Sequence, residues 1–181
     1  MNARAWLRAA EAEALAKLDL LRRPLFEEMR RLSKRPAGPP HACCKRERNQ
    51  MRISPLEARS IAEAFRRDRE LRKHRAAVLA RLEGELPRLE NSTERQGFDC
   101  PLLEGTRCLV HDVAKPIGCL AWNDGREYSA AAWNAFARRD ALNDAVYGPD
   151  WKLRVIPLWL RRVFGRVEVA GSRKRPYAPK G

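Results

Sequence analysis

Five cysteines are the residues of this chain whose type and spacing suggest chemistry. Cys43 and Cys44 are adjacent, 55 residues separate them from Cys100, and Cys108 and Cys119 follow after seven and ten residues. Thiolates are soft ligands, and a set of four suits tetrahedral zinc or an iron–sulfur cluster. Cytosolic proteins seldom form structural disulfides, and an odd number of cysteines cannot all pair internally, so the spacing favours metal binding. The alternative is a set of small buried apolar side chains.

The residues around the cysteines form two motifs in a defined order. Cys-Cys at 43–44 is followed by Ile-Ser-Pro-Leu-Glu-Ala at 53–58, and Cys-Pro-Leu-Leu-Glu-Gly-Thr-Arg-Cys at 100–108 is followed by Lys-Pro-Ile-Gly-Cys at 115–119. Together they resemble the YkgJ-like cysteine-cluster family, the CxxCxxCC-type zinc- or iron-chelating domain, over residues 41–122. The resemblance implies a small domain that chelates zinc or iron, and it leaves the physiological role of the metal open.

All five cysteines are candidate metal ligands. Adjacent cysteines point in different directions, so we expect only one of Cys43 and Cys44 to ligate the same centre as the other three. The expected four-ligand set is therefore Cys100, Cys108, Cys119 and one member of that pair. The remaining thiol is then a fifth, exchangeable ligand or a buried bystander, since a disulfide between neighbours in the chain would be strained.

The three histidines have different expected roles. His41 stands with Pro39 and Pro40 where the family usually has one or two more cysteines, so it is a candidate additional ligand through a neutral imidazole. The alternative for His41 is a solvated loop side chain. His111 stands where the family has Tyr and is expected to pack against its neighbours. His74 lies in a charged helical segment and is expected at the surface.

The charge of the site does not distinguish the metals. Four thiolates leave a net charge of about −2 with Zn²⁺ and also with a [4Fe–4S]²⁺ cluster. The nearby cations that could compensate either charge are Lys45, Arg46, Arg107 and Lys115. An iron–sulfur cluster is the first choice, because the Cys-Pro step and an all-cysteine ligand set recur in such sites, and zinc is the alternative.

The elements that position the cysteines are predicted to be mainly helical. Apolar residues at helical spacing predict a helix over residues 1–32, which Pro24 should kink or split. A capping box beginning at Ser54 predicts the start of a second helical stretch. Its apolar pattern extends to Leu89, with a break expected near 67–70.

The segment 98–122 has a different pattern. It predicts two very short extended pieces around Gly105, followed by a short helix from Pro116 that carries Cys119 and Trp122.

Two more helices are predicted, one from Ser129 to Gly148 and a short one over 157–164. The residues expected to face inward from the first of them are Ala132, Trp133, Phe136 and Leu142.

The expected fold class is therefore mainly α: a small irregular helical cysteine-cluster domain with a minor short β-hairpin and an N-terminal helical extension. We expect the extension over 1–35, the metal-binding domain over 36–170 and a basic flexible tail over 171–181.

The chain is strongly basic. Its 181 residues include 37 Lys+Arg and 23 Asp+Glu, which gives a formal net charge of +14. The excess is +4 in 1–35, +4 in 36–99 and +7 in 150–181, whereas 100–149 carries −1. Basic flanks could bind nucleic acid or an acidic protein, and the alternative is a solvated Arg-rich helix surface. Nucleic-acid binding with a structural metal is accordingly the second function class.

Several other classes are disfavoured. No run approaches the roughly 18 apolar residues of a membrane span, and residues 1–32 lack the apolar region of a secretory signal, so we expect a cytoplasmic protein with no membrane partner. A glycine-rich cofactor loop, H-E-x-x-H, a P-loop and a nucleophile elbow are all absent from the sequence. Enzymatic activity is the less favoured class, because a catalytic metal needs an open coordination position.

Overall fold

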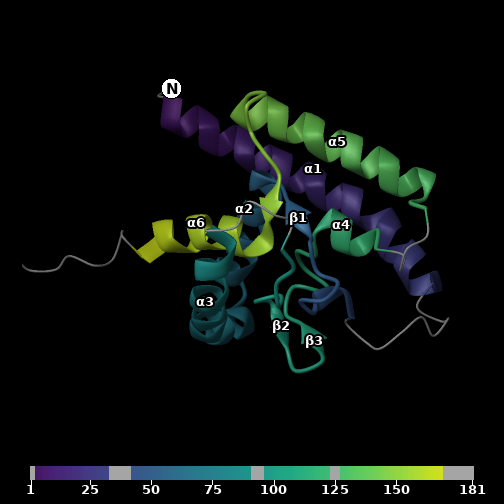
Figure 1. Ribbon diagram of the computed structural model, residues 1–181. Coiled ribbons are helices and arrows are strands. Elements are labelled where there is room, and N and C mark those ends of the chain that lie inside the picture. The colour runs from purple at the N-terminus through teal and green to yellow at the C-terminus, as the bar shows by residue number, and fades with distance from the viewer. Residues whose placement is uncertain (1–2, 33–41, 91–95, 123–126, 169–181) are drawn as a thin grey trace, which may run out of the picture.

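The computed structural model describes residues 3–32, 42–90, 96–122 and 127–168, most of which are helical (Figure 1). In chain order the elements are α1 (Ala3–Leu32), the 3₁₀ turn η1 (Ala42–Cys44), β1 (Arg52–Ile53), α2 (Pro55–Arg67), α3 (Arg69–Glu90), β2 (Leu103–Glu104), β3 (Arg107–Cys108), α4 (Ile117–Leu120), α5 (Ala130–Tyr147), β4 (Arg154–Val155) and α6 (Ile156–Glu168). The predicted fold class, mainly α with a short β-hairpin, is confirmed.

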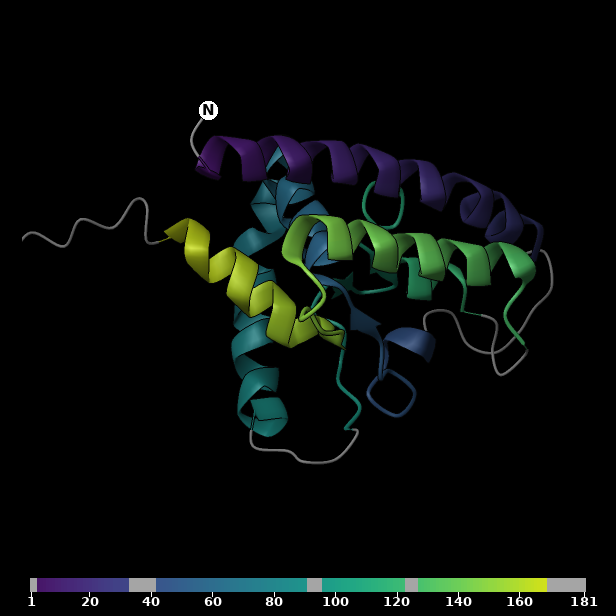
Figure 2. The same ribbon diagram turned by 90° about the horizontal axis from the view of Figure 1, so that it is seen from above.

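The two long helices α1 and α5 lie side by side, as both views show (Figure 1, Figure 2). Between them and α4 lies an apolar core, called here the α1–α5 core. Its main residues are Leu18, Leu21, Leu25, Leu56, Ile117, Leu120, Ala132, Ala135 and Val146. α1 runs through Pro24 as one helix, so the predicted split does not occur. Buried leucines on both sides of Pro24 share this core, and their burial offsets the backbone hydrogen bond that proline cannot make.

The start of α2 and the break after it follow the sequence prediction. The Ser54 hydroxyl accepts a hydrogen bond from the Glu57 amide at 3.2 Å, and the Glu57 carboxylate accepts one from the Ser54 amide at 2.9 Å. Asp68 separates α2 from α3, and its Oδ1 accepts from the amides of Glu70 at 2.7 Å and Leu71 at 3.2 Å. Both helix starts are thus set by side chains close to them in the sequence.

A second apolar core, called here the α3–α6 core, joins α2, α3, α6 and the β2–β3 hairpin. Its main residues are Ile61, Phe65, Val78, Leu82, Phe98, Leu102, Val110, Leu160 and Phe164. Phe65 and Phe164 meet edge to face, with ring centroids 5.3 Å apart. Cys100 and Cys108 are members of this core, and Cys44 and Cys119 pack against it. The core therefore forms one side of the cysteine region.

A two-stranded pairing of β1 with β4 was not predicted. Arg52 lies opposite Val155 and Ile53 opposite Arg154 in an antiparallel register. The strands have only two residues each, which is too short for an alternating pattern to be visible in the sequence. The pairing holds the start of α6 against the start of α2.

The structure differs from the prediction at two tryptophans. Trp133, expected to face inward, is 61% exposed on α5. Its ring meets Tyr128 and Phe136 edge to face at the surface instead of entering the core. Trp122 lies beyond the end of α4, which stops at Leu120.

Some expectations fall on parts of the chain that the structure does not describe. The expected basic tail over 171–181 and His41 lie outside the described residues. Within the described ranges, no helix is both long and apolar enough to cross a membrane.

Candidate metal centre

Two backbone hydrogen bonds bring the Cys43-Cys44 turn to the segment that begins at Phe98. The Phe98 amide donates to the Asn49 carbonyl at 3.1 Å, and the Cys100 amide donates to the Cys44 carbonyl at 2.9 Å. Gly97 permits this approach, because a Cβ atom at this position would lie 1.9 Å from the carbonyl oxygen of Arg46. The two cysteine-bearing segments meet because no side chain separates them here.

The β2–β3 hairpin returns Cys108 to the neighbourhood of Cys100. Gly105 forms the turn with φ +56°, a left-handed conformation that favours glycine. Leu103 pairs with Cys108 across the hairpin, and the Leu103 amide donates to the Cys100 carbonyl at 3.0 Å. The predicted pair of short extended pieces around Gly105 is therefore confirmed.

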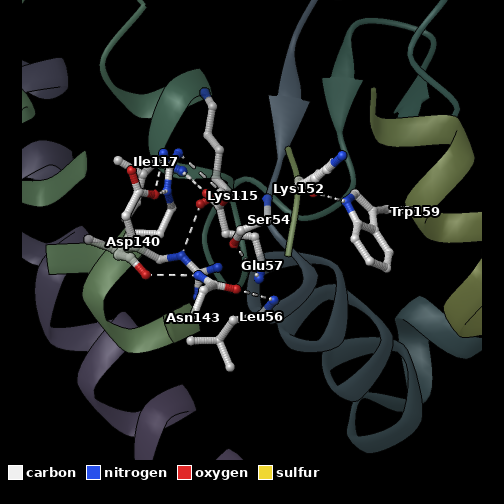
Figure 3. Close-up of polar contacts among 11 residues, drawn as sticks. Ser54, Leu56, Glu57, Lys115, Ile117, Asp140, Asn143, Lys152 and Trp159 are labelled. Atoms are coloured by element: carbon white, nitrogen blue, oxygen red, sulfur yellow. Dashed lines mark hydrogen bonds and ion pairs between the residues drawn. The ribbon is translucent and has the colours of Figure 1, made fainter. Parts of the chain in front are cut away.

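Two buried side chains from distant elements hold the segment that leads into α4 and Cys119. Glu57 Oε1 accepts a hydrogen bond from the Ile117 amide at 2.8 Å, and Arg22 Nε donates to the Lys115 carbonyl at 3.0 Å. Both Glu57 and Arg22 are almost fully buried. Figure 3 shows Glu57 near Ser54 and Ile117, with Asn143 close by. The position of Cys119 thus depends on contacts with α1 and α2.

The same buried network continues into α5. Arg139 Nη1 lies 3.8 Å from Glu57 Oε2, and Asn143 Nδ2 donates to the Arg139 carbonyl at 2.8 Å. Asn143 Oδ1 accepts from the Leu56 amide at 3.1 Å, which joins α5 to the first turn of α2 (Figure 3). Sequence reasoning missed these partners. The capping box located Glu57, but no local signal connects that residue to Ile117 or Arg139, which lie 60 and 82 positions away.

The thiols of Cys43 and Cys44 point toward each other, with their Sγ atoms 3.9 Å apart. The expectation that these neighbours diverge is therefore wrong. They lie in the 3₁₀ turn η1. A Zn–S bond of about 2.3 Å gives about 3.8 Å between two sulfurs of a tetrahedral site. The pair matches one edge of such a tetrahedron.

Electrostatic coupling shows that the other thiols are neighbours of this pair. A hydrogen bond with Cys100 raises the pKa of Cys44 to about 12, with smaller contributions from burial and from Cys108. The hydrogen bond with Cys44, followed by burial, raises the pKa of Cys43 far above its ordinary value. Burial raises the pKa of Cys108. Cys43, Cys44 and Cys108 are therefore protonated at neutral pH in the metal-free chain.

Cys119 completes the group from α4. Burial raises its pKa well above the ordinary value, and Cys108, Cys43 and Cys44 act on it in the same direction. Cysteines from four separate segments thus lie within electrostatic range of one another. Soft thiol donors gathered in a largely apolar surrounding fit zinc or iron chemically.

Lys115 is the cation placed beside the thiols. Its ammonium group opposes the rise in pKa at Cys43, Cys108 and Cys119. Its Nζ lies 3.1 Å from His111 Nδ1, and it also contacts the sulfur of Met29 at 3.5 Å.

A second predicted compensating cation lies elsewhere. Arg46 pairs with Glu85 at 2.5 Å and with Asp99 at 3.2 Å. Its charge is thus directed to carboxylates, and the charge of Lys115 to the thiols.

The described histidines are both half-buried, and His111 packs against its neighbours as expected. The His111 ring makes an edge contact with Phe26, with ring centroids 6.3 Å apart, and its side chain is 36% exposed. His74 Nδ1 lies 2.7 Å from Glu104 Oε2 at the surface, as expected for a residue of the charged helix.

The described residues hold no preformed coordination sphere. Within these ranges, no group of three or more histidine, cysteine, aspartate or glutamate side chains is arranged as a metal site.

Comparisons with known proteins yield no relative. No family model, no curated protein and no solved structure matches this chain. A functional assignment therefore depends on the geometry and chemistry of the residues themselves.

Proposed function

We propose that this protein binds a metal through the thiolates of its five cysteines and belongs to the cysteine-cluster class that its motifs resemble. The observation that carries the proposal is the convergence of five thiols from four chain segments beside one ammonium group. Burial in the α3–α6 core is the alternative reason for cysteines to lie there, and the Lys115 ammonium group beside them favours the metal site. Metal binding would deprotonate them, and the positive charge of the metal would replace the protons.

A bound metal would link segments that are far apart in the sequence. The candidate ligands come from the turn at Cys43 and Cys44, the segment at Cys100, the hairpin at Cys108 and α4 at Cys119. The metal would close the loop of more than 50 residues between Cys44 and Cys100. Because the metal binds only the folded chain in this way, the free energy of unfolding would depend on metal. A structural or electron-transfer role therefore fits better than catalysis, since five candidate thiols leave little room for an open coordination position.

The identity of the metal has two candidates. The all-cysteine set and the Cys-Pro step support an iron–sulfur cluster. The 3.9 Å separation of the Cys43 and Cys44 sulfurs supports a single tetrahedral ion such as Zn²⁺. Both would be expected in a reducing compartment, and we propose the cytoplasm.

The first test is anaerobic purification from cells grown without added metal, followed by elemental analysis and visible spectroscopy of the same sample. Iron with sulfide and a broad charge-transfer band in the visible would identify a cluster. Stoichiometric zinc and a colourless solution would identify a single-ion site. A preparation that contains neither metal, and that takes up neither under reducing conditions, would overturn the proposal.

Substitution of one buried thiol tests the ligand assignment. Cys108→Ser is expected to lower both the metal content and the melting temperature, because a hydroxyl is a poor ligand for soft metals. Ala135→Ser is the matched control, since it places the same hydroxyl at a site 2% exposed in the α1–α5 core. Full metal content in Cys108→Ser would remove Cys108 from the ligand set.

Nucleic-acid binding, the second function class, has less support from described contacts. Several arginines of the helix surfaces pair with carboxylates: Arg66 and Arg67 with Glu63, Arg88 with Glu85, and Arg161 with Glu83. Such pairing reduces the charge that is free to contact phosphates. A phosphate-driven complex would weaken steeply as salt rises, which a salt titration would detect.

A further inference from the structure

A pocket lies at the junction of α1, α2, α6 and the segment that follows α5, and none of the five cysteines lines it. Its volume is about 350 Å³, within the range of small-molecule sites. Its walls include Tyr147, Trp151 and Trp159, and its charged residues are Glu11, Arg59, Asp150 and Arg162. We call it the tryptophan pocket. The metal centre proposed above does not account for it.

The polar edges of the aromatic walls are already engaged within the protein. The Trp159 indole N–H donates to the Lys152 carbonyl at 3.3 Å (Figure 3), and the Trp151 indole N–H donates to Asp144 Oδ1 at 2.6 Å. Trp159 is only 8% exposed. Because the Trp159 ring is buried in the α3–α6 core, Trp151 is the indole of this wall that is left for stacking.

Half of the charge in the pocket is neutralised internally. Glu11 accepts a hydrogen bond from the Tyr147 hydroxyl at 2.7 Å and pairs with Arg59 at 3.4 Å. Burial, together with this hydrogen bond, raises the pKa of Tyr147, so that the hydroxyl keeps its proton. Glu11, Arg59 and Tyr147 form a closed set at the α1 side of the pocket.

The remaining charges, Arg162 and Asp150, have no ion pair within the described ranges. The Arg162 guanidinium lies over the Trp159 ring, 5.3 Å from its centroid, which holds a cation against an aromatic surface. Both side chains are exposed at the mouth of the pocket, and a ligand that contacts both would bring an anionic group to Arg162 and an N–H donor to Asp150. It would also present a flat ring to Trp151.

We propose that the tryptophan pocket binds a mononucleotide with an amino-substituted base. The base stacks against Trp151, its exocyclic amine donates to Asp150, and the phosphate contacts Arg162. Adenine, cytosine and guanine carry such an amine, and uracil does not. Arg162 thereby acquires the anionic partner that the described part of the chain does not supply.

The test is isothermal titration of the purified protein with AMP, and separately with UMP, adenosine and inorganic phosphate. Saturable binding of AMP, tighter than that of the other three, is expected. Arg162→Ala should weaken AMP about tenfold, the effect of losing one charge-assisted phosphate contact, while leaving adenosine nearly unchanged. Asp150→Ala should reduce the preference for AMP over UMP.

Arg161→Ala is the matched control, because Arg161 is the neighbour of Arg162 on α6 but pairs with Glu83 at 2.5 Å. It should leave AMP affinity within about twofold of the unmodified protein. Absence of saturable AMP binding at millimolar concentration would overturn the proposal. So would equal weakening by the two arginine variants, or binding of a single-stranded oligonucleotide without binding of AMP.

Discussion

Buried charges at the centre of this protein are paired across elements. Glu57 is completely buried, and its carboxylate accepts from the amides of Ser54 and Ile117 while facing Arg139. Burial lowers the pKa of Arg22, and the charge of Glu57 opposes this effect. Taking one member from such a network leaves its partners buried without compensation, which costs more than the network contributes.

Glu57→Gln is expected to destabilise the protein by about 2–3 kcal/mol, because an uncharged amide replaces the carboxylate that two backbone amides and Arg139 require. The free energy of unfolding in urea, followed by far-UV circular dichroism, measures this loss. Glu83→Gln is the control: its exposed pair with Arg161 should cost at most about 1 kcal/mol. Equal losses in the two variants would show that Glu57 contributes no more than a surface residue.

At the scale of the elements, the turn after η1 and the segment that begins at Gly97 pack backbone to backbone. Arg46 lies against Gly97 at a distance that leaves no room for a methyl group. The Arg46 amide also donates to Asp99 Oδ1 at 3.2 Å, which strengthens the junction. This junction sets the distance between Cys44 and Cys100.

Gly97→Ala is expected to separate the two segments, lowering the melting temperature and the metal content together. Gly84→Ala is the matched control, because Gly84 lies in α3 and a Cβ atom there meets nothing within 4 Å. It should stabilise the protein by about 0.5–1 kcal/mol through helix propensity alone. Thermal unfolding and elemental analysis of both variants measure these effects, and an unchanged metal content in Gly97→Ala would contradict the expectation.

The ion pairs of Glu63 in the last turns of α2 make a contribution to the free energy of unfolding that depends on pH. A hydrogen bond from Arg66, with further attraction from Arg66 and Arg67, lowers the pKa of Glu63 from 4.5 to about 2. Because the folded-state value lies below the unfolded one, this contribution is complete above pH 4.5 and is lost as the pH falls toward 2.

The unfolding free energies of the wild type and Glu63→Gln should therefore differ above pH 4.5 and converge as the pH approaches 2. Urea unfolding of both proteins at a series of pH values measures the difference. A gap between them that is independent of pH over this range would show that the ion pairs of Glu63 contribute nothing to stability.

At the scale of the whole molecule, the cysteine region lies where the two cores meet. Cys100 and Cys108 belong to the α3–α6 core, and Cys119 packs against it from α4. The other face of α4 places Ile117 and Leu120 in the α1–α5 core. A metal bound by these thiols would tie the two cores together.

Removal of metal is expected to lower the melting temperature by at least about 5 °C, because the cysteine segments are then no longer linked through the metal. Circular dichroism with and without a chelator, with metal content measured on the same samples, tests this. The Cys108→Ser variant should show a smaller chelator effect. A metal-free sample that melts at the temperature of the loaded protein would exclude a stabilising role for the metal.

The sequence by itself determined the elements whose signals are local. The capping box from Ser54 to Glu57 and the cap at Ser129 arise from side chains three positions from the backbone groups they bind, and the turn at Gly105 arises from the positive φ that glycine adopts. Such contacts form regardless of what packs around them, so residue type and spacing are sufficient to predict them. The cysteine motifs supplied the candidate ligands, and metal binding by these residues stays a prediction.

Only the tertiary structure decided how these pieces meet. Arg22 reaches the Lys115 carbonyl across 93 positions, and Glu57 reaches the Ile117 amide across 60. Trp133 faces solvent although its spacing suits the core. The sequence carries no local mark of these outcomes, because burial and long-range pairing depend on which helix faces pack together. That choice follows from the summed burial of two whole cores rather than from the preference of any one residue.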